Sequence, residues 1–496
     1  MKDLLTIRTM TLVTVVSMFL NGCTHHPQPQ NKEEAHCNII VYEASEKLDI
    51  ATDCSEDGLR IKAFNERFIS HEFSGGIGTI RFSADVTEIG LRAFQGNKNM
   101  TSITIPQSVK VIDSSAFSGC SGLRHIEIPK NVELIESSAF SGCSGLTRID
   151  VDNDNPSYDS RNNCNAIIES SSNTLIAGCQ TTIIPNSVVA LGDYAFDGCT
   201  TLASIKLPKF VTKIGRYAFQ DCSNVASVEV DSGNVCFDSR NGCNAIIETA
   251  TNKMVLACEN TTIPASVTSI GYYAYRTHPD LSSVYIPNSV TNIDDAAFSN
   301  WSNLTSIVIP GSVTNVGDNL FHSCSSLTKV RISRNLSSIG NGMFNGCQSL
   351  STVVIPPSVT RIGGCAFSDC TALTHIVLPK SITNIDYDAF VHCSHLVSIN
   401  IPPSVVSIGD EAFYGCSSLT DITLPKSITE IGLYAFGYCD RLKKLRVKWQ
   451  QPPSMYFESF LYLDKDSCTL VVPRGSEELY KNTNPWNYFK NIKSAG

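Results

Sequence analysis

Residues 396–418 read LVSINIPPSVVSIGDEAFYGCSS, and this 23-residue pattern recurs along most of the 496-residue chain. A phenylalanine returns at one place in the pattern, in steps of 23 residues apart from two of 56, and Tyr275 fills that place once. A fixed period in this range is typical of a solenoid, in which each repeat forms one coil and stacks on the next. The recurring phenylalanines are Phe94, Phe117, Phe140, Phe196, Phe219, Phe298, Phe321, Phe344, Phe367, Phe390, Phe413 and Phe436.

Each repeat carries the signal of one strand followed by turns. In the stretch quoted above, Ile399 and Ile401 alternate with Ser398 and Asn400, which is the pattern of a strand with one buried face. Pro402 ends the strand, since proline has no N–H for a ladder hydrogen bond. The later Ala-Phe pair is expected in a short helical turn on the far side. The sequence therefore predicts an α/β-type repeat solenoid with one parallel β-sheet and short helical or turn segments opposite it.

Two repeats are longer than the others. The units that begin at Leu146 and Val225 span 33 residues and contain matching insertions, YDSRNNCNAIIESSSNTLIAGC at 158–179 and FDSRNGCNAIIETATNKMVLAC at 237–258. In each insertion two apolar runs flank a polar tip, which predicts a β-hairpin. We expect these two hairpin excursions to project from a rigid rod, where they are candidate contact sites for a partner.

The chain has 20 cysteines, and ten of them fall at one position late in the repeat. Equivalent positions in stacked coils have parallel Cβ directions, a poor geometry for a disulfide, so we predict a ladder of buried thiols. The ten are Cys120, Cys143, Cys199, Cys222, Cys324, Cys347, Cys370, Cys393, Cys416 and Cys439. Six other cysteines form either disulfides or free thiols. The candidate disulfide pairs are Cys164 with Cys179, Cys243 with Cys258, and Cys37 with Cys54.

The amino-terminal residues predict export and a lipid anchor. A weakly basic start precedes an apolar run at 10–20, which is too short to span a bilayer but suits a signal peptide. The run ends in Leu-Asn-Gly-Cys, which resembles a bacterial lipobox with Cys23 as the lipidated residue. Residues 1–22 are then the lipoprotein signal peptide, and residues 23–36 are the anchored cysteine and a flexible tether. An ordinary signal peptide before an unmodified cysteine is the alternative.

The rest of the chain divides into an array and its two caps. Residues 77–441 hold about 15 repeats and form the solenoid, flanked by an N-terminal cap at 37–76 and a C-terminal cap at 442–496. Repeat arrays need caps that shield their end coils. Trp486 and Phe489 are predicted to cover the last coil.

No motif for catalysis appears in the sequence. There is no HExxH, GxSxG, phosphate-binding GxxxxGK[ST] or CxxC motif, and the caps are too short for a catalytic domain. Charged residues make up 17% of the chain, the net charge is −9, and no Lys/Arg-rich run suggests nucleic-acid binding. We therefore predict no enzyme activity, no cofactor and no metal site.

Side chains at the outward strand positions are not needed for the core, so they are the candidates for contact with a partner. Tyr285, Lys329 and Arg331 lie within two repeats of one another, so they are predicted to form a basic and aromatic patch. Ser398 and Asn400 are further candidate ligand contacts on the same face. A merely solvated surface is the alternative for all five residues.

The repeat IPxSVTxIGxxAFxxC resembles the BspA-like leucine-rich-repeat family of bacterial surface proteins. The segments SRNxCNAIIE and LVVPRGSEELY, with the following W..FKNI, resemble parts of that family's lipoproteins from gut anaerobes, and the resemblance covers roughly residues 70–496. It implies a curved leucine-rich-repeat solenoid on the cell surface, with adhesion to host matrix proteins or other bacteria through protein binding, and no shared active site.

The same resemblance implies a lipid-anchored protein of the bacterial outer membrane. The anchored protein is either exposed at the cell surface or oriented toward the periplasm, and the sequence is compatible with both. A structural or assembly component of the envelope and a glycan-binding module are the alternatives to a protein-binding adhesion scaffold.

Overall fold

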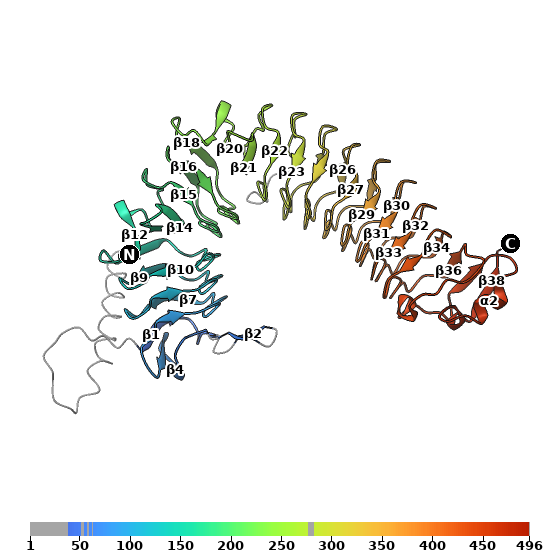
Figure 1. Ribbon diagram of the computed structural model, residues 1–496, viewed down its shortest axis with the longest axis horizontal. Helices are drawn as coiled ribbons and strands as arrows, with labels where there is room; N and C mark the ends of the chain where they lie inside the picture. The colour runs from blue at the N-terminus through green and yellow to red at the C-terminus, as the bar shows by residue number, and fades with distance from the viewer. Residues whose placement is uncertain (1–37, 51–53, 57–58, 62, 276–281, 496) are drawn as a thin grey trace.

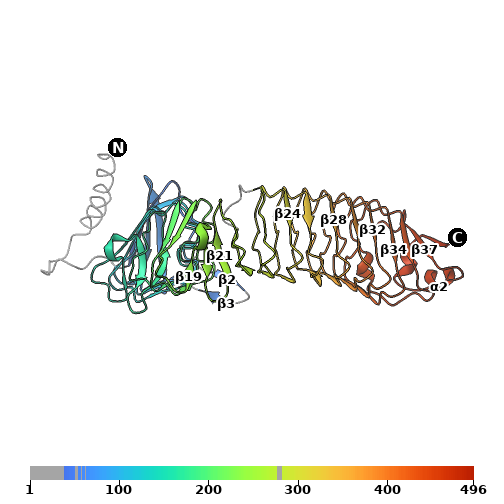
Figure 2. The same ribbon diagram turned by 90° about the horizontal axis from the view of Figure 1, so that it is seen from above.

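The computed structural model describes residues 38–50, 54–56, 59–61, 63–275 and 282–495. They form a curved solenoid of stacked coils, with one cap at each end of an arc (Figure 1). Seen from above, the coils of the carboxyl-terminal half stack as a row of thin parallel loops (Figure 2). The repeat solenoid expected from the 23-residue period is confirmed, and it contains very little helix.

The strand predicted at the start of each repeat is present in most coils and pairs in parallel with the same strand of the next coil. Ile376 pairs with Ile399, and both side chains are buried while their neighbours face solvent. This row is made of β9 (His125–Ile128), β11 (Arg148–Val151), β16 (Ser204–Leu207), β18 (Ser227–Val230), β24 (Ser306–Val308), β26 (Lys329–Arg331), β28 (Thr352–Val354), β30 (His375–Val377), β32 (Ser398–Asn400), β34 (Asp421–Leu424), β36 (Lys444–Val447), β37 (Thr469–Val472) and β38 (Asn491–Ser494).

A second row of very short parallel strands follows the proline of each repeat, so the prediction of a single sheet is wrong. In β33 (Ser407–Ile408), Ile408 is buried and pairs with Ile385 of the preceding coil. Gly409 directly follows this strand, and an added Cβ there would lie 2.4 Å from the backbone nitrogen of Tyr387. The other members are β6 (Glu88–Ile89), β8 (Val111–Ile112), β10 (Leu134–Ile135), β15 (Ala190–Leu191), β17 (Lys213–Ile214), β22 (Ser269–Ile270), β23 (Asn292–Ile293), β25 (Asn315–Val316), β27 (Ser338–Ile339), β29 (Arg361–Ile362), β31 (Asn384–Ile385) and β35 (Glu430–Ile431).

The Ala-Phe segment of each repeat forms turns and not helix. The Phe413 backbone N–H donates to the carbonyl of Ala435 in the next coil at 2.9 Å, which takes it away from any bond within its own segment. Glu411, two residues earlier, has φ 53°, a left-handed conformation that interrupts a right-handed helix. The helices of the described residues are α2 (Glu477–Lys481) and the 3-10 turns η1 (Arg161–Asn163), η2 (Arg240–Gly242), η3 (Phe457–Phe460) and η4 (Trp486–Tyr488).

The recurring phenylalanines stack into a ladder. Phe390 is fully buried, and its ring centroid lies 5.3 Å from that of Phe367 and 5.4 Å from that of Phe413. Rings at this spacing interact favourably beyond the area that they bury. Within each run of regular coils every coil supplies one ring at the same height, so the ladder joins those coils; the three runs are 94–140, 196–219 and 275–436.

The ten repeat cysteines form the predicted ladder of buried free thiols. The Cys416 Sγ donates to the Phe390 carbonyl oxygen at 3.2 Å, and Cys393 makes the same bond to Phe367 at 3.1 Å. Burial raises the pKa of the Cys324 thiol to about 12 and the pKa of Cys393 well above its usual value. These thiols therefore act as small core residues whose S–H satisfies a buried carbonyl.

We expect iodoacetamide at pH 8 to alkylate Cys236 about tenfold or more faster than Cys393 in the native protein, because the reactive species is an accessible thiolate. The Cys236 side chain is partly exposed, whereas Cys393 is buried and its pKa is raised by that burial. Peptide mapping by mass spectrometry measures both rates, and the protein in denaturant is the control, where the two rates should converge. Equal rates in the native state would contradict a closed thiol ladder.

The two hairpin excursions do not project from the rod, and that prediction is wrong. In the first, β13 (Ala166–Glu169) and β14 (Thr174–Gly178) pair antiparallel, and β14 then pairs in parallel with β15 of the short-strand row. The hairpin is therefore a layer of the solenoid itself. Its other strand is β12 (Tyr158–Asp159), and the second hairpin repeats the arrangement with β19 (Phe237–Asp238), β20 (Ala245–Glu248) and β21 (Lys253–Ala257).

Each hairpin is buried on both faces and separates two parts of the core. Ile167 packs with the buried residues of the first coils, whereas the neighbouring Ile168 packs with those of the middle coils. In the second hairpin, Ile246 packs with the middle cluster and Ile247 with the long carboxyl-terminal cluster. The core of the described residues thus consists of three clusters divided by two hairpins.

This arrangement leaves the hairpin cysteines unbridged. Cys164, Cys179, Cys243 and Cys258 are all free. In the first hairpin Ala166 pairs with Gly178, so Cys164 and Cys179 do not stand opposite each other, and they belong to different core clusters. The cross-strand disulfides are therefore wrong, because the hairpin turns the two thiols toward opposite faces. Cys37 and the side chain of Cys54 lie outside the described part of the chain.

The caps continue the sheet of the array. At the amino end, β1 (Ile39–Ala44) lies antiparallel between β5 (Ile77–Phe82) and β7 (Met100–Thr104). Three further strands belong to this end: β4 (Phe68–Ser74) pairs with β5, and β2 (Cys54–Glu56) pairs with β3 (Leu59–Ile61).

At the carboxyl end, β36, β37 and β38 extend the parallel row. Trp486 and Phe489 are buried there, with ring centroids 5.3 Å and 5.6 Å from that of Phe460, which stacks on Phe436. The prediction that these two residues cover the last coil is confirmed.

Candidate functional site

A contiguous row of exposed side chains crosses five coils of the carboxyl-terminal half. We name it the strand-face stripe, and it consists of Tyr285, Val308, Arg331, Val354 and Val377. Tyr285 is 77% exposed and the three valines are 50%, 80% and 72% exposed, which is unusual for residues of this kind. Large exposed apolar patches mark interaction sites on soluble proteins.

The repeat itself places these residues side by side. Val308 pairs with Arg331 across β24 and β26, and Val354 pairs with Val377 across β28 and β30. Neighbouring strands lie about 4.8 Å apart, so outward residues at equivalent positions form a continuous surface. The inward neighbours, such as Ile307 and Ile376, are buried and fix the strands in this orientation.

Outside the stripe the strand face is mostly polar, with Ile183 as an exposed apolar exception, and several of its charges pair with one another. In the amino-terminal half, Lys206 pairs with Glu229 at 3.1 Å, and Asp150 accepts from both His125 and Arg148 at 2.7 Å. Toward the carboxyl end, Arg446 and Asp421 form the same kind of cross-coil pair at 3.0 Å. These pairs partly neutralise the charge of the strand face in those coils.

The positive charges beside the stripe have no such partner. Among the described residues, Lys329, Arg331 and Arg334 form no ion pair. The acidic residues of the segment 282–368 are Asp294, Asp295 and Asp318, and they follow the short strands β23 and β25, away from the strand face. The stripe therefore carries a local surplus of positive charge on a chain whose net charge is −9.

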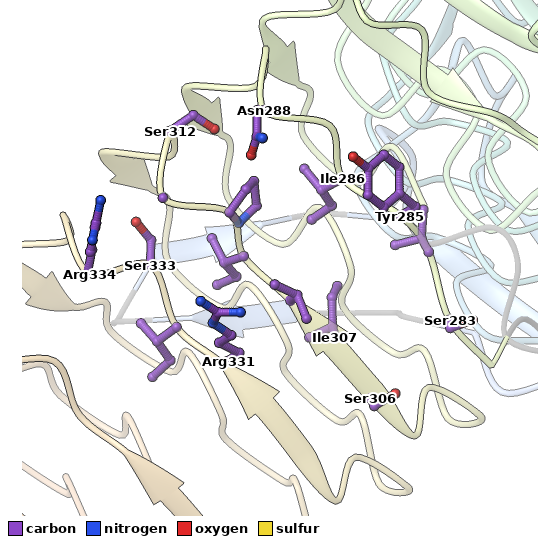
Figure 3. Close-up of a pocket in the computed structure, with 16 residues that line it drawn as sticks. Ser283, Tyr285, Ile286, Asn288, Ser306, Ile307, Ser312, Arg331, Ser333 and Arg334 are labelled. Atoms are coloured by element: carbon purple, nitrogen blue, oxygen red, sulfur yellow. The ribbon is translucent and has the colours of Figure 1, made fainter.

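A hollow of about 810 Å³ opens at one end of the stripe. In Figure 3, Tyr285 and Arg334 lie on opposite sides of this hollow and Arg331 lies between them. Its apolar lining includes Val308 and Pro310. The hollow thus combines an aromatic ring, two guanidinium groups and an apolar floor.

One buried hydroxyl in the lining lacks a hydrogen-bond partner. In regular repeats the equivalent serine donates to a carbonyl of the preceding coil, as Ser404 does to Ile382 at 2.6 Å and Ser427 to Val405 at 2.6 Å. The Oγ of Ser312 is buried in the same way but has no partner. The Oγ of Ser289, one coil earlier at the same repeat position and outside the lining, is unpartnered as well. Of the two, Ser312 is the hydroxyl that a ligand in the hollow would approach.

The structure brings together two of the five contact residues predicted from the sequence. Tyr285 and Arg331 line the hollow, and Lys329 lies two residues before Arg331 on β26 and outside the lining. Ser398 is exposed on β32, beyond the end of the stripe. Asn400 is exposed on β32, and its amide accepts from the Leu378 backbone N–H at 3.0 Å and donates to the Leu378 carbonyl at 3.1 Å; its role as a ligand contact stays a prediction.

Val308, Val354, Val377 and Arg334 were missed by sequence reasoning. Val308, Val354 and Val377 stand at an outward strand position that holds Thr104, Glu127, Lys206 or Glu229 in other repeats. An apolar residue at that position was the available signal. The hairpin tips, in contrast, offer little surface, since only Ser171 and Ser172 in the first and Ala250 and Thr251 in the second are exposed.

Cys23, the predicted lipidation site, lies outside the described residues. In the part of the chain that the structure covers, no helix is both long enough and apolar enough to cross a bilayer. The same residues contain no group of three His, Cys, Asp or Glu side chains placed to hold a metal ion.

A family model described as the BspA type leucine-rich repeat region matches residues 67–172, 167–243, 245–374 and 338–460. No curated protein sequence matches the chain. Among solved structures, a leucine-rich repeat protein from Eubacterium ventriosum is 19% identical, with 66% of this chain and 82% of that chain covered and a TM-score of 0.47.

Two other solved structures are similar in the same way. A leucine rich cell surface protein from Faecalibacterium prausnitzii is 23% identical over 70% of this chain and 94% of that chain, with a TM-score of 0.42. A leucine-rich repeat protein from Bacteroides ovatus is 25% identical over 86% of this chain and 99% of that chain, with a TM-score of 0.41.

Proposed function

The chain belongs to the BspA-type leucine-rich repeat family, and from this premise we propose that it is a non-enzymatic lipoprotein of the cell envelope that binds another protein through its strand-face stripe. Leucine-rich repeat domains commonly mediate protein–protein interaction, and proteins of this kind are generally scaffolds without catalytic activity. The observation that carries the proposal is the stripe, a row of four exposed apolar or aromatic side chains and one arginine at equivalent positions of consecutive coils.

The composition of the stripe suits the centre of a protein interface. Interface centres are enriched in tyrosine and arginine and depleted in lysine and acidic residues, and a few such side chains carry most of the binding energy. Tyr285 and Arg331 are of this kind, and the valines supply apolar area between and beyond them. The stacked coils hold these side chains rigidly, which lowers the entropic cost of association.

The predicted lipobox supports an anchored location. In the proposal, Cys23 carries the lipid, residues 24–36 act as the tether, and the array extends from the bacterial outer membrane as an adhesin for host matrix proteins or other bacteria. The second role in the same class is an assembly component that binds an envelope protein through the same stripe. Protease treatment of intact cells distinguishes the two, since an adhesin is digested and a periplasm-facing protein is protected until the membrane is breached.

We expect Val354→Asp to weaken attachment of the full-length protein about tenfold or more, because a charge is then forced into the dehydrated centre of the interface. Binding is measured to immobilised extracellular-matrix proteins and to whole bacterial cells. Ile183→Asp is the matched control, since Ile183 is 76% exposed at the equivalent position of a coil outside the stripe. If Val354→Asp binds as the wild type does, or if both variants lose binding equally, the stripe is not the contact face.

A further inference from the structure

We infer that the hollow at the end of the strand-face stripe binds an acidic segment of the partner protein, with its carboxylates on Arg331 and Arg334. The inference rests on the proposed function, because it names the chemistry of the partner that the stripe binds. It uses three independent observations, namely the unpaired cations, the unpartnered hydroxyl and the apolar floor.

The cations select a carboxylate. Arg331 and Arg334 both line the hollow, and neither forms an ion pair with the described residues around it. A guanidinium stays charged at every physiological pH and binds a carboxylate through two parallel N–H donors. Lys329 on the same strand adds a third positive charge close to the hollow. Three positive charges thus lie close together without an ion pair among the described residues, so this cluster favours an anionic partner.

The hydroxyl of Ser312 provides a further donor. Its Oγ is buried in the lining without a partner, although Ser404 and Ser427 at the same repeat position are satisfied. A carboxylate held by the two arginines brings additional acceptor oxygens into the hollow. Rotation of the Ser312 side chain about its Cα–Cβ bond then lets this hydroxyl, buried in the free protein, donate to one of them.

The apolar floor favours a protein segment over an acidic polysaccharide. Val308 and Pro310 offer no hydrogen-bonding side chain, and the stripe continues from the hollow into Val354 and Val377. Sugar hydroxyls placed on these valines would lose hydrogen bonds to water without replacement. A segment in which acidic and apolar residues alternate leaves no polar group unpaired in this way, and its apolar side chains cover Tyr285 and the valines.

The test is fluorescence anisotropy on the full-length protein with a labelled eight-residue peptide that alternates glutamate and valine. The matched peptide replaces each glutamate by glutamine. We expect the glutamate peptide to bind about tenfold or more tightly than its glutamine counterpart, and its affinity to fall as salt is raised. Equal affinity of the two peptides would overturn the inference.

The protein variants locate the effect. R331Q with R334Q is expected to lower the affinity for the glutamate peptide about tenfold. The control is R148Q with R446Q, which makes the same change of charge at two strand-face arginines that already pair with Asp150 and Asp421. If both double variants lost the same affinity for the glutamate peptide, the loss would follow from net charge alone, and a site in the hollow would be contradicted. Polygalacturonate that binds tightly at this site while the glutamate peptide does not would likewise refute a protein ligand.

The attachment assay separates this inference from the proposed function. If Val354→Asp abolishes attachment while R331Q with R334Q leaves it intact, the stripe binds a partner but the acidic segment is wrong. If neither variant changes attachment, the proposed function itself fails.

Discussion

Phe390→Ala is expected to lower the free energy of unfolding by about 3–5 kcal/mol, the usual cost of removing a fully buried ring. Phe390 lies between Phe367 and Phe413 with centroid distances of 5.3 Å and 5.4 Å, so its removal also leaves one face of each neighbouring ring without a stacking partner. Urea denaturation followed by circular dichroism measures the loss. Hydrogen exchange shows which coils lose stability.

The matched control for this substitution is Phe210→Ala. The Phe210 side chain is 55% exposed and lies outside the ladder, so the same chemical change there should cost about 0.5 kcal/mol or less. Phe390→Leu separates burial from stacking, since it keeps an apolar side chain and removes the ring. A loss at Phe390 as small as that at Phe210 would contradict a ladder that holds the coils together.

Exchange should rise first in the coils next to Phe390. Each coil of a solenoid contacts only its neighbours, so stability is close to a sum of coil and interface contributions. Amides of β30 and β32 are then expected to lose protection before those of β9 or β11. A uniform loss of protection over the whole array would mean that the coils unfold as one cooperative unit.

The contacts that join equivalent positions could be predicted from the sequence. A residue type that recurs every 23 positions meets its own copy in the next coil, so the phenylalanine and cysteine ladders follow directly from the period. The buried faces of β30 and β32 follow from period-2 alternation in the same way. These features need only the repeat and the stacking of one coil on another.

Features that depend on backbone hydrogen bonds between coils could not be predicted from the repeat. The short strand β33 has only two residues, which is too few for an alternation pattern. The turn at Ala412 and Phe413 looked helical because neither residue forbids a helix, but the Phe413 N–H bonds to Ala435 of the next coil. The hydrogen bonds of the Asn400 amide to the Leu378 backbone could not be predicted for the same reason.

At the candidate site, charge and aromaticity identified Tyr285 and Arg331 in the sequence. The exposed valines were overlooked because valine is also the ordinary residue of a buried strand, and only the register of the repeat places Val354 and Val377 outward. The unpartnered hydroxyl of Ser312 depends on what surrounds it, which no local pattern encodes. The candidate site therefore consists of departures from the repeat.

The hairpins were misjudged although the sequence carried a signal. Consecutive apolar residues, as at Ile167 and Ile168 or Ile246 and Ile247, are typical of a strand that is buried on both faces, whereas a projecting hairpin alternates apolar and polar residues. The structure has both faces buried. Each hairpin is thus the junction through which two parts of the core contact each other.

Ile167→Ala and Ile168→Ala are expected to destabilise opposite sides of this junction by about 2–4 kcal/mol each, the common range for such a truncation in a core. Ile167 packs with the amino-terminal cluster and Ile168 with the middle cluster. Amide exchange should rise about 30-fold or more in β9 and β11 for the first variant and in β15 and β16 for the second. Each substitution is the matched control for the other.

The equivalent variants in the second hairpin test the junction between the middle and the carboxyl-terminal clusters. Ile246→Ala should raise exchange in the middle coils, and Ile247→Ala should raise it in the coils that begin with β22 and β23, since these two residues pack with the middle and carboxyl-terminal clusters. Side chains of a projecting hairpin would cost about 0.5 kcal/mol or less to truncate. Small effects in all four variants would indicate that the hairpins project from the rod. If both variants of one hairpin raised exchange in the same coils, a junction with two distinct faces would be contradicted.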